Sequence, residues 1–443
     1  MKKLYLLISL LFVLCVFSSP AFGANWTGKT ARYVRSGATG TGSGLNWTDA
    51  YTDLPGTLTR DYVYYVADGT YSTYTFDDNE SGSLWIYVVK ATASDHGAAG
   101  DWSSAYGDGQ AAFNGTINVS KGYLEINGQA RDDDDWFDIN SYGFKINHNG
   151  SAKQLSIGRA CQCNPDHLIF EYIGIQAQQG LPGDGHAVGW YAVEHYNGSG
   201  TQSGDGFTDV VFGHMLIKNG CVGILHRHTQ SGVFVQYSAF DNNESEANYN
   251  HGEAHSDYYV SGVTIRWNKY RDIQGTAVIA CNSGSGHVMY GNVIYNTVDV
   301  GDGAIGFSGG SANNNCIFNN TFVDNSDNSA NITDMGATNR NNVWVNCASS
   351  GLRGTSSGTN NTTASTSIFS NYANDDFSLG TDTAAGIDVS ALGGACPAGT
   401  IYDMNGVAYG SDGDWELGAY AYDAGATPSI IKKIMNFFRR LRG

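Results

Sequence analysis

The sequence predicts an all-β protein whose fold is a single-stranded right-handed parallel β-helix, a solenoid that grows by repetition of one coil. Three observations lead to this class. A short phrase returns six times between Asp209 and Ser350, apolar and polar residues alternate with period two inside each copy, and an asparagine recurs at one place in successive copies. The predicted fold also has an N-terminal cap and a short C-terminal amphipathic helix.

The repeated phrase is an alternating apolar run, then a polar residue, a spacer and a large apolar residue. The copies read VVFGHMLIKN, VFVQYSAFDN, VTIRWNKYRD, HVMYGNVIYN, NCIFNNTFVDN and NNVWVNCASS. The large apolar residues, here named anchors, are Ile217, Phe240, Tyr270, Ile294, Phe322 and Ala348. Since the anchors recur about every two to three dozen residues and the alternation is that of strands, each copy is predicted to be one coil.

A polar residue two positions before the anchor indicates that the coils stack in register. This position holds Asn268, Asn292, Asn320 and Asn346 in four successive copies, preceded by Met215 and Ser238. Amide side chains in strands about 4.8 Å apart can hydrogen-bond to one another along the stack. The sequence therefore predicts an asparagine ladder.

The first residues have the pattern of a secretory signal peptide. Lys2 and Lys3 precede an apolar run, and the sequence Ala-Phe-Gly ends at Gly23, after which we expect cleavage. The protein is thus predicted to be secreted, to the extracellular space or the periplasm. Residues 24–80 are predicted to form the cap and first coil, with a short helical piece around Trp47 to Leu58, and 81–423 the β-helix with C-terminal strands that close the stack.

Residues 424–443 are predicted to be a linker and a basic tail. The segment Ser429 to Gly443 reads SIIKKIMNFFRRLRG, which places apolar and basic residues on opposite sides of a helix. This tail could contact an anionic surface, dock on the acidic stack or remain disordered.

Composition limits the partners. A formal net charge of −18 argues against nucleic acid as a partner, and it also opposes a polyanionic substrate unless a local cationic site or a bridging metal is present. We expect a monomer. The seven cysteines that follow the signal peptide are spread evenly, which favours small buried residues over a disulfide framework, although Cys161, Cys163 and His167 could form part of a zinc site.

Ionisable residues gather on the strand that precedes the repeated phrase. Three consecutive coils supply Glu194, His195, His226, Arg227, His228, Glu253, His255 and Asp257. Stacked coils would place them about one strand spacing apart, and so many charges are typical of a binding cleft. The insertions QAQQGLPGDGHAVG and NNESEANYNHG would form its walls. The alternative is that His226 or His255 is an inward, hydrogen-bonded histidine.

This layout resembles the pectate-lyase-like superfamily of right-handed β-helices. The segment GEAHSDYYVSGVTIRWNKYRDIQGTAVIACNSG, from Gly252, is similar to a coil of alginate-active enzymes. The C5-epimerase branch carries Asp-Pro-His-Asp where this chain has Glu253 to Asp257. The Lys and Arg of the calcium-dependent lyase branch are replaced by Tyr259 and Ala280. The resemblance implies cleavage or epimerisation of an acidic extracellular polysaccharide in a groove along one sheet.

The leading hypothesis is a lyase that cleaves a uronate glycan by β-elimination. Arg227 would neutralise the uronate carboxylate, His255 or His226 would be the base, and His228 or Tyr258 the acid. Glu253 and Asp257 would orient the histidines or bind calcium, the one cofactor considered beside none at all. Residues expected to bind substrate are Glu194, His195, Tyr258 and Tyr259.

Three alternatives stay open from the sequence. A glycoside hydrolase could use two carboxylates among Glu194, Glu253 and Asp257. A zinc ion could bind His226, His228 and His255. A non-catalytic carbohydrate-binding or surface adhesion protein would use rows of tyrosine and tryptophan that stack on sugars.

Overall fold

The structure is a computed structural model that describes residues 26–147, 153–177, 191–196, 206–227, 231–242, 252–298, 303–308, 314–326, 331–334, 338–348, 351–354, 357–383 and 386–422. The predicted signal peptide, the basic tail and His228 lie outside the described residues, as do most of the two insertions. No helix long and apolar enough to cross a membrane occurs within the described ranges.

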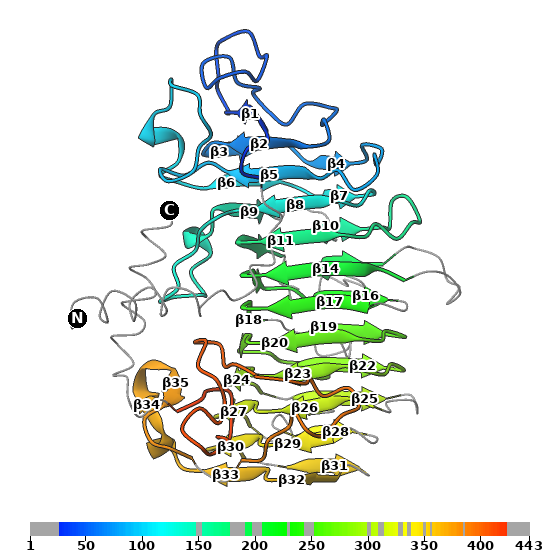
Figure 1. Ribbon diagram of the computed structural model, residues 1–443, viewed down its shortest axis with the longest axis vertical. Helices are drawn as coiled ribbons and strands as arrows, with labels where there is room; N and C mark the ends of the chain where they lie inside the picture. The colour runs from blue at the N-terminus through cyan, green and yellow to red at the C-terminus, as the bar shows by residue number, and fades with distance from the viewer. Residues whose placement is uncertain are drawn as a thin grey trace, which may run out of the picture.

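Three long parallel sheets run the length of the stack, and successive strands of each sheet follow one another along the molecule (Figure 1). Sheet A contains β1 (Thr30–Val34), β2 (Tyr62–Val66), β5 (Ile86–Lys90), β8 (Leu124–Asn127), β11 (Leu168–Glu171), β14 (Thr208–Gly213), β17 (Ser231–Gln236), β20 (Val263–Arg266), β23 (Val288–Tyr290), β26 (Cys316–Phe318), β29 (Thr338–Arg340) and β32 (Ser357–Thr359).

Sheet B contains β3 (Gly69–Tyr71), β6 (Ala111–Asn114), β9 (Phe144–Asn147), β12 (Ile173–Gln176), β15 (Leu216–Lys218), β18 (Ala239–Asp241), β21 (Lys269–Arg271), β24 (Val293–Tyr295), β27 (Thr321–Val323), β30 (Val343–Val345) and β33 (Thr362–Ala364). Sheet C contains β4 (Tyr74–Phe76), β7 (Ile117–Val119), β10 (Lys153–Ile157), β13 (Tyr191–His195), β16 (Val222–Arg227), β19 (Glu253–Tyr258), β22 (Ile279–Asn282), β25 (Ile305–Ser308), β28 (Ile332–Asp334) and β31 (Leu352–Gly354).

Each coil visits the sheets in the order A, B, C, and this arrangement confirms the predicted parallel β-helix. The interior is built from apolar columns in which register partners stack, such as Leu155, Val193 and Ile224 of sheet C. The described residues include short 3-10 turns at Ser104–Tyr106, Ile139–Ser141, Thr366–Ile368 and Tyr372–Asn374. The core therefore comes from strands that alternate between an inner and an outer face.

The asparagine ladder lies at the corner between sheets A and B. Side-chain amides donate from Asn268 to Asn292, from Asn292 to Asn320 and from Asn320 to Asn342, at 3.1, 2.9 and 3.0 Å. Each of these side chains is fully buried. The ladder satisfies amides that would otherwise be buried without a partner, which is why the corner keeps one polar residue per coil.

The ladder corrects the alignment of the sixth copy. Asn342, not Asn346, continues the ladder, and the anchor of that coil is Trp344, whose ring stacks on Phe322 with a centroid distance of 5.2 Å. Asn346 follows β30 with a φ of 51°, and Ala348 does not occupy the anchor column. The predicted alignment of the sixth copy is four residues too late, because the turn that follows the sheet B strand in each coil also contains an Asn or Asp.

The predicted helical piece at Trp47 to Leu58 is wrong, because this segment is a series of turns. Asn46 Oδ1 accepts from the Asp49 amide at 2.7 Å, and Asp101 accepts from the Trp47 amide at 3.1 Å. Such side-chain acceptors compete with helical hydrogen bonds. Trp47 is nevertheless fully buried, among Tyr33 and other aromatic residues of the first coils.

The end of the chain turns back along the stack instead of closing it. After β33, strands β34 (Phe369–Asn371) and β35 (Asp376–Leu379) form an antiparallel pair beside the last coils (Figure 1). The following residues, here named the return segment (386–422), lie against the side of earlier coils. Trp267 Nε1 donates to the Tyr402 carbonyl at 2.9 Å, and Asn319 Nδ2 donates to the Glu416 carbonyl at 2.8 Å.

The expectation that the cysteines form no disulfides is wrong for four of them. Cys161 is bonded to Cys163, and Cys316 to Cys396. The second bond joins β26 to the return segment across a separation of 80 residues, which the spacing does not reveal. His167 pairs with Asp209 at 3.1 Å, so the zinc fragment at Cys161 and Cys163 does not form. Among the described residues, Cys221, Cys281 and Cys347 are not in a disulfide.

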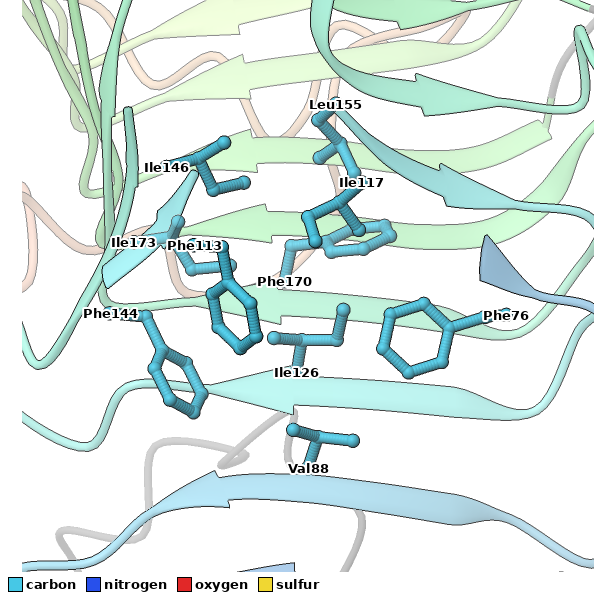
Figure 2. Close-up of a pocket in the computed structure, with 10 residues that line it drawn as sticks. All are labelled: Phe76, Val88, Phe113, Ile117, Ile126, Phe144, Ile146, Leu155, Phe170 and Ile173. Atoms are coloured by element: carbon cyan, nitrogen blue, oxygen red, sulfur yellow. The ribbon is translucent and has the colours of Figure 1, made fainter. Parts of the chain in front are cut away.

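Figure 2 shows a small cavity inside the N-terminal coils, and its walls are entirely apolar. An interior space without polar groups offers no hydrogen-bond partner to a sugar or to water. A glycan site must therefore be sought on the outside of the stack. The cavity is lined by Phe76, Val88, Phe113, Ile117, Ile126, Phe144, Ile146, Leu155, Phe170 and Ile173.

Candidate active site

Apart from His228, outside the described residues, and Tyr259, which follows β19, the predicted site residues lie on β13, β16 and β19, three consecutive strands of sheet C. The register aligns Glu194, Leu225 and Ser256 in one column across the three strands. It aligns His195, His226 and Asp257 in a second column. The coils thus bring these residues to neighbouring strands, as predicted. Because successive side chains of a strand point to opposite faces, the two columns lie on opposite sides of the sheet.

The histidine column faces the interior. His195, His226 and His255 are fully buried, and their rings pack on core aromatic residues: His195 lies 3.8 Å from Phe207 and His255 lies 4.6 Å from Phe240, between centroids. His255 Nε2 is hydrogen-bonded to the Tyr270 hydroxyl at 3.0 Å. The prediction that His195, His226 and His255 share a surface with Glu194 and Arg227 is therefore wrong.

Burial also sets the charge of these histidines. It lowers the pKa of His226 to about 3, and it lowers the pKa of His195 and His255 well below the usual value. The Nδ1 atoms of His195 and His226 lie 3.1 Å apart, which fits a single shared proton between neutral rings. These rings have no access to a glycan, so they serve neither as base nor as substrate contacts.

Asp257 also faces the interior. Its carboxyl oxygen lies 3.8 Å from the Cys281 thiol, and burial raises its pKa to about 8. Glu253 and Asp257 are four residues apart on β19, about 13 Å along an extended strand. They therefore do not bind one calcium ion together, and Asp257 is also removed from the proposed carboxylate pair of a hydrolase.

The outer face of sheet C carries a group of cations and phenols instead, here named the outer cluster: Lys153, Arg159, Tyr191, Glu194, Tyr196, Arg227 and Tyr258. Glu194 is almost fully buried within it and pairs with Lys153 and, at 3.2 Å, with Arg159. Ser156 donates a further hydrogen bond to Glu194 at 3.3 Å. Two cations hold this carboxylate, so Glu194 positions them and is not available as a hydrolase acid or nucleophile.

Arg227 is held between two aromatic rings. Its guanidinium carbon lies 5.1 Å from the ring centroid of Tyr196 and 5.1 Å from that of Tyr258. Arg159 lies at the same distance over Tyr196. The column follows from the register, since Arg227 and Tyr258 are neighbours on β16 and β19 and Tyr196 follows β13. Aromatic faces favour a cation and restrict its motion without neutralising its charge.

The charge of Arg227 affects the pKa values of two phenols of the outer cluster. Burial raises the pKa of Tyr191 above its usual value, and the nearby Arg227 opposes that shift. Burial likewise raises the pKa of Tyr258, with Glu253 adding to the shift, while Ser256 and Arg227 oppose it. Two phenols therefore lie close to one guanidinium, an arrangement suited to proton transfer beside a bound anion.

The remaining predicted residues are placed as follows. Glu253 begins β19 and lies close enough to Tyr258 to affect its pKa. Tyr259 is 45% exposed at the turn that follows β19, with a φ of 57°. Sequence reasoning missed Lys153, Arg159, Tyr191 and Tyr196. An alignment extended by one coil would have paired Lys153 with Tyr191 and thereby found two of them.

Calcium is the ion that the sequence resemblance implies, and the described residues of this face do not fit it. Calcium binds six to eight oxygen ligands. Here Glu194 is engaged by Lys153 and Arg159, and Arg227 occupies the neighbouring strand. The positive charge that would face an acidic sugar is thus supplied by side chains, and no calcium step is derived.

The three parallel sheets define a parallel β-helix, and one of its outer faces carries a cationic and phenolic cluster. The crystal structure of pectate lyase Pel9A is similar, with a TM-score of 0.53 at 13% identity over 89% of this chain and 98% of that chain.

Two further lyase structures match less well. The PL6 family polysaccharide lyase Pedsa3628 from Pseudopedobacter saltans has a TM-score of 0.31 at 12% identity, over 83% of this chain and 89% of that chain. The PL6 family alginate lyase AlyGC has a TM-score of 0.29 at 11% identity, over 82% of this chain and 54% of that chain. No family model matches the sequence, and no curated protein sequence matches it.

Proposed function

We propose that the protein is a polysaccharide lyase that cleaves an acidic, uronate-containing glycan by β-elimination on the outer face of sheet C. One observation carries the proposal. On a chain with a net charge of −18, Lys153 and Arg159 lie on or just after β10, Arg227 lies on β16 on the other side of β13, and Arg227 lies between two phenols. This is the local cationic site that an acidic substrate requires.

The chemistry begins with the uronate carboxylate. In β-elimination a base removes the proton on C5, a double bond forms between C4 and C5, and the C4–O bond breaks with its electron pair left on O4, which then receives a proton. The charge that develops on the carboxylate must be stabilised. Arg227 is assigned this role, because a guanidinium can donate two parallel hydrogen bonds to a carboxylate and remains charged at any working pH.

We assign the two proton transfers to Tyr191 and Tyr258. With the histidines in the interior, these phenols are the titratable groups of the outer cluster beside Arg227, as its effects on their pKa values indicate. Tyr258 keeps the role of acid toward O4, and Tyr191 takes the role of base. Burial raises the pKa of Tyr191 and so disfavours its phenolate, and Arg227, which opposes this shift, would assist the base as well as bind the substrate.

The remaining expectations belong to the same proposal. The protein would be secreted, act as a monomer on an extracellular polysaccharide and need no nucleic acid partner. The calcium that the sequence resemblance implies is not part of this proposal, and contact of the Ser429 to Gly443 tail with an anionic surface stays a prediction of its amphipathic pattern.

The test is a screen of purified protein on acidic and neutral polysaccharides, with ultraviolet absorbance and reducing ends measured together. A lyase forms an unsaturated uronate that absorbs in the ultraviolet. Reducing ends without this absorbance would show a hydrolase, and binding without either signal would show a carbohydrate-binding module. Either of these outcomes overturns the proposal.

A further inference from the structure

A second cluster of chemically active side chains lies inside the stack, on the opposite side of sheet C from the outer cluster. It consists of Asp257 on β19, Cys281 on β22 and His287, which follows β22 at the corner before β23. One ligand atom from each residue can be chosen so that all three lie within 4.8 Å of one another. The three side chains are buried, with exposures of 1%, 2% and 0%.

We infer that Asp257, Cys281 and His287 form an internal site for one zinc-class divalent cation. A carboxylate oxygen, a thiolate sulfur and an imidazole nitrogen are a ligand set that zinc accepts in its tetrahedral sites. Ligands about 2.0–2.3 Å from such an ion lie a little under 4 Å from one another, so small rotations of the three side chains would close the site.

Buried polar atoms without a hydrogen-bond partner support this metal site. Asp257 Oδ1 is buried and has no hydrogen-bond partner, although a buried carboxyl oxygen without one is costly. The described residues offer Asp257 no salt bridge, and its recorded neighbour Cys281 is a weak donor at 3.8 Å. A divalent cation would compensate both the carboxylate and the thiolate, whereas the apo cluster must keep both protonated to avoid buried charge.

We take the fourth ligand from the preceding coil, where His226 lies outside the group of three and would have to move toward it. His226 is the register partner of Asp257 and is fully buried, and its Nε2 atom has no hydrogen-bond partner. The ring is close enough to His287 for the two to influence each other electrostatically. His226 Nδ1 faces His195 Nδ1 at 3.1 Å, and in the tautomer in which His226 Nδ1–H donates to His195, His226 Nε2 is free to bind metal.

The position of the cluster indicates a structural site. The ion would bind side chains from consecutive coils, β16, β19 and β22, and would have no open position toward the outer face where a glycan would lie. Such an ion stabilises the folded state because the unfolded chain lacks the preformed ligand set. This inference does not depend on the proposed lyase activity.

The experiment uses the full-length protein, purified without added metal and then treated with a zinc chelator. We expect about one tightly held zinc ion per chain by elemental analysis, and a melting temperature about 5 °C or more lower after chelation that zinc restores and calcium does not. Cobalt added to the stripped protein should give the near-ultraviolet thiolate-to-cobalt absorption. Cys281→Ser should remove this band, and Cys347→Ser, a matched change at another free thiol, should leave it intact.

Two outcomes with cobalt would contradict the proposed metal site. A stripped protein that binds no cobalt, or a thiolate band that survives Cys281→Ser, would overturn the site. Because Cys281→Ser could impair folding, Asp257→Asn provides a second measure. Loss of zinc in the folded Asp257→Asn protein supports the site. A more stable Asp257→Asn protein that never contained metal would show a neutral hydrogen-bonded cluster and would refute it.

Discussion

The guanidinium carbon of Arg227 lies 5.1 Å from the ring centroids of both Tyr196 and Tyr258. Each of these residues comes from a different coil, and the parallel register of sheet C brings them into one column. The cation is therefore fixed by its neighbours on both sides. It lies on the outer face, where a substrate carboxylate could reach it.

Arg227→Ala should lower kcat/KM for the polysaccharide about a hundredfold, the usual cost of removing one group that stabilises developing charge. Arg227→Lys should recover only part of this loss, because an ammonium cannot form two parallel hydrogen bonds to a carboxylate. Initial rates of ultraviolet absorbance give both values. Unchanged turnover in the folded Arg227→Ala protein would remove Arg227 from the mechanism.

Tyr191→Phe and Tyr258→Phe should each reduce kcat by about a hundredfold or more, since each removes a proton-transfer group and keeps the ring. The effect should fall on kcat more than on KM. Tyr259→Phe is the control, since Tyr259 is 45% exposed and is not placed in the outer cluster. Equal losses in all three variants would indicate a general effect of the tyrosines on folding.

His255→Ala should reduce stability and not catalysis. The change removes the 3.0 Å hydrogen bond to Tyr270 and leaves a cavity beside Phe240, which together cost about 2–4 kcal/mol in the free energy of unfolding. Activity per folded molecule should stay near that of the unaltered protein. Denaturant unfolding and rates measured well below the melting temperature separate the two effects, and a hundredfold loss of rate in folded protein would restore a catalytic role.

Asn320→Ala should destabilise the stack by about 1–3 kcal/mol, because it leaves buried groups of two adjacent coils without partners. The Asn320 amide donates to Asn342 at 3.0 Å and to the Met289 carbonyl at 3.1 Å. Asn140→Ala is the matched control, since Asn140 is exposed and its side chain is hydrogen-bonded only to Asp138 among its recorded partners. Urea unfolding compares them, and equal losses would argue against a special role for the ladder.

Asp403 should make stability depend on pH. Burial raises its pKa from 3.8 to about 7, against the effect of three backbone amides that donate to the carboxylate. The folded state therefore holds this proton more tightly than the unfolded state, so its contribution to stability is full below about pH 4 and is lost as the pH rises to about 7. Asp403→Asn should flatten this part of the curve of unfolding free energy against pH, and an unchanged slope would contradict the assignment.

Most of the fold was predictable because the same sequence pattern recurs in successive coils. The register of Phe240, Tyr270, Ile294 and Phe322 in sheet B is the one that the anchors indicate. The sixth copy was misaligned because a ladder asparagine precedes each sheet B strand and a left-handed Asn or Asp follows it, so Asn342 and Asn346 look alike in the sequence. The path of the return segment was not predictable, since no repeat describes it.

The site was predictable only in part. The coils bring Glu194, Arg227 and the histidines to adjacent strands, but the face to which each residue points depends on parity along the strand. His195 and Glu194 are neighbours in the chain and lie on opposite sides of the sheet. An imidazole or a carboxyl inside an apolar stack is neutral, as the lowered pKa of His226 and the raised pKa of Asp257 illustrate. The sequence alone does not distinguish such residues from a charged cleft.

The return segment also limits how the protein can be shortened. Many solenoids tolerate removal of terminal repeats, because each repeat contacts only its neighbours. Here Cys396 is bonded to Cys316, 80 residues earlier, and the Tyr402 carbonyl accepts from Trp267, 135 residues earlier. The last part of the chain therefore packs on coils in the middle of the stack. A truncation within 386–422 would expose aromatic side chains in the middle of the molecule, and a shorter variant would have to be made by deleting an internal coil.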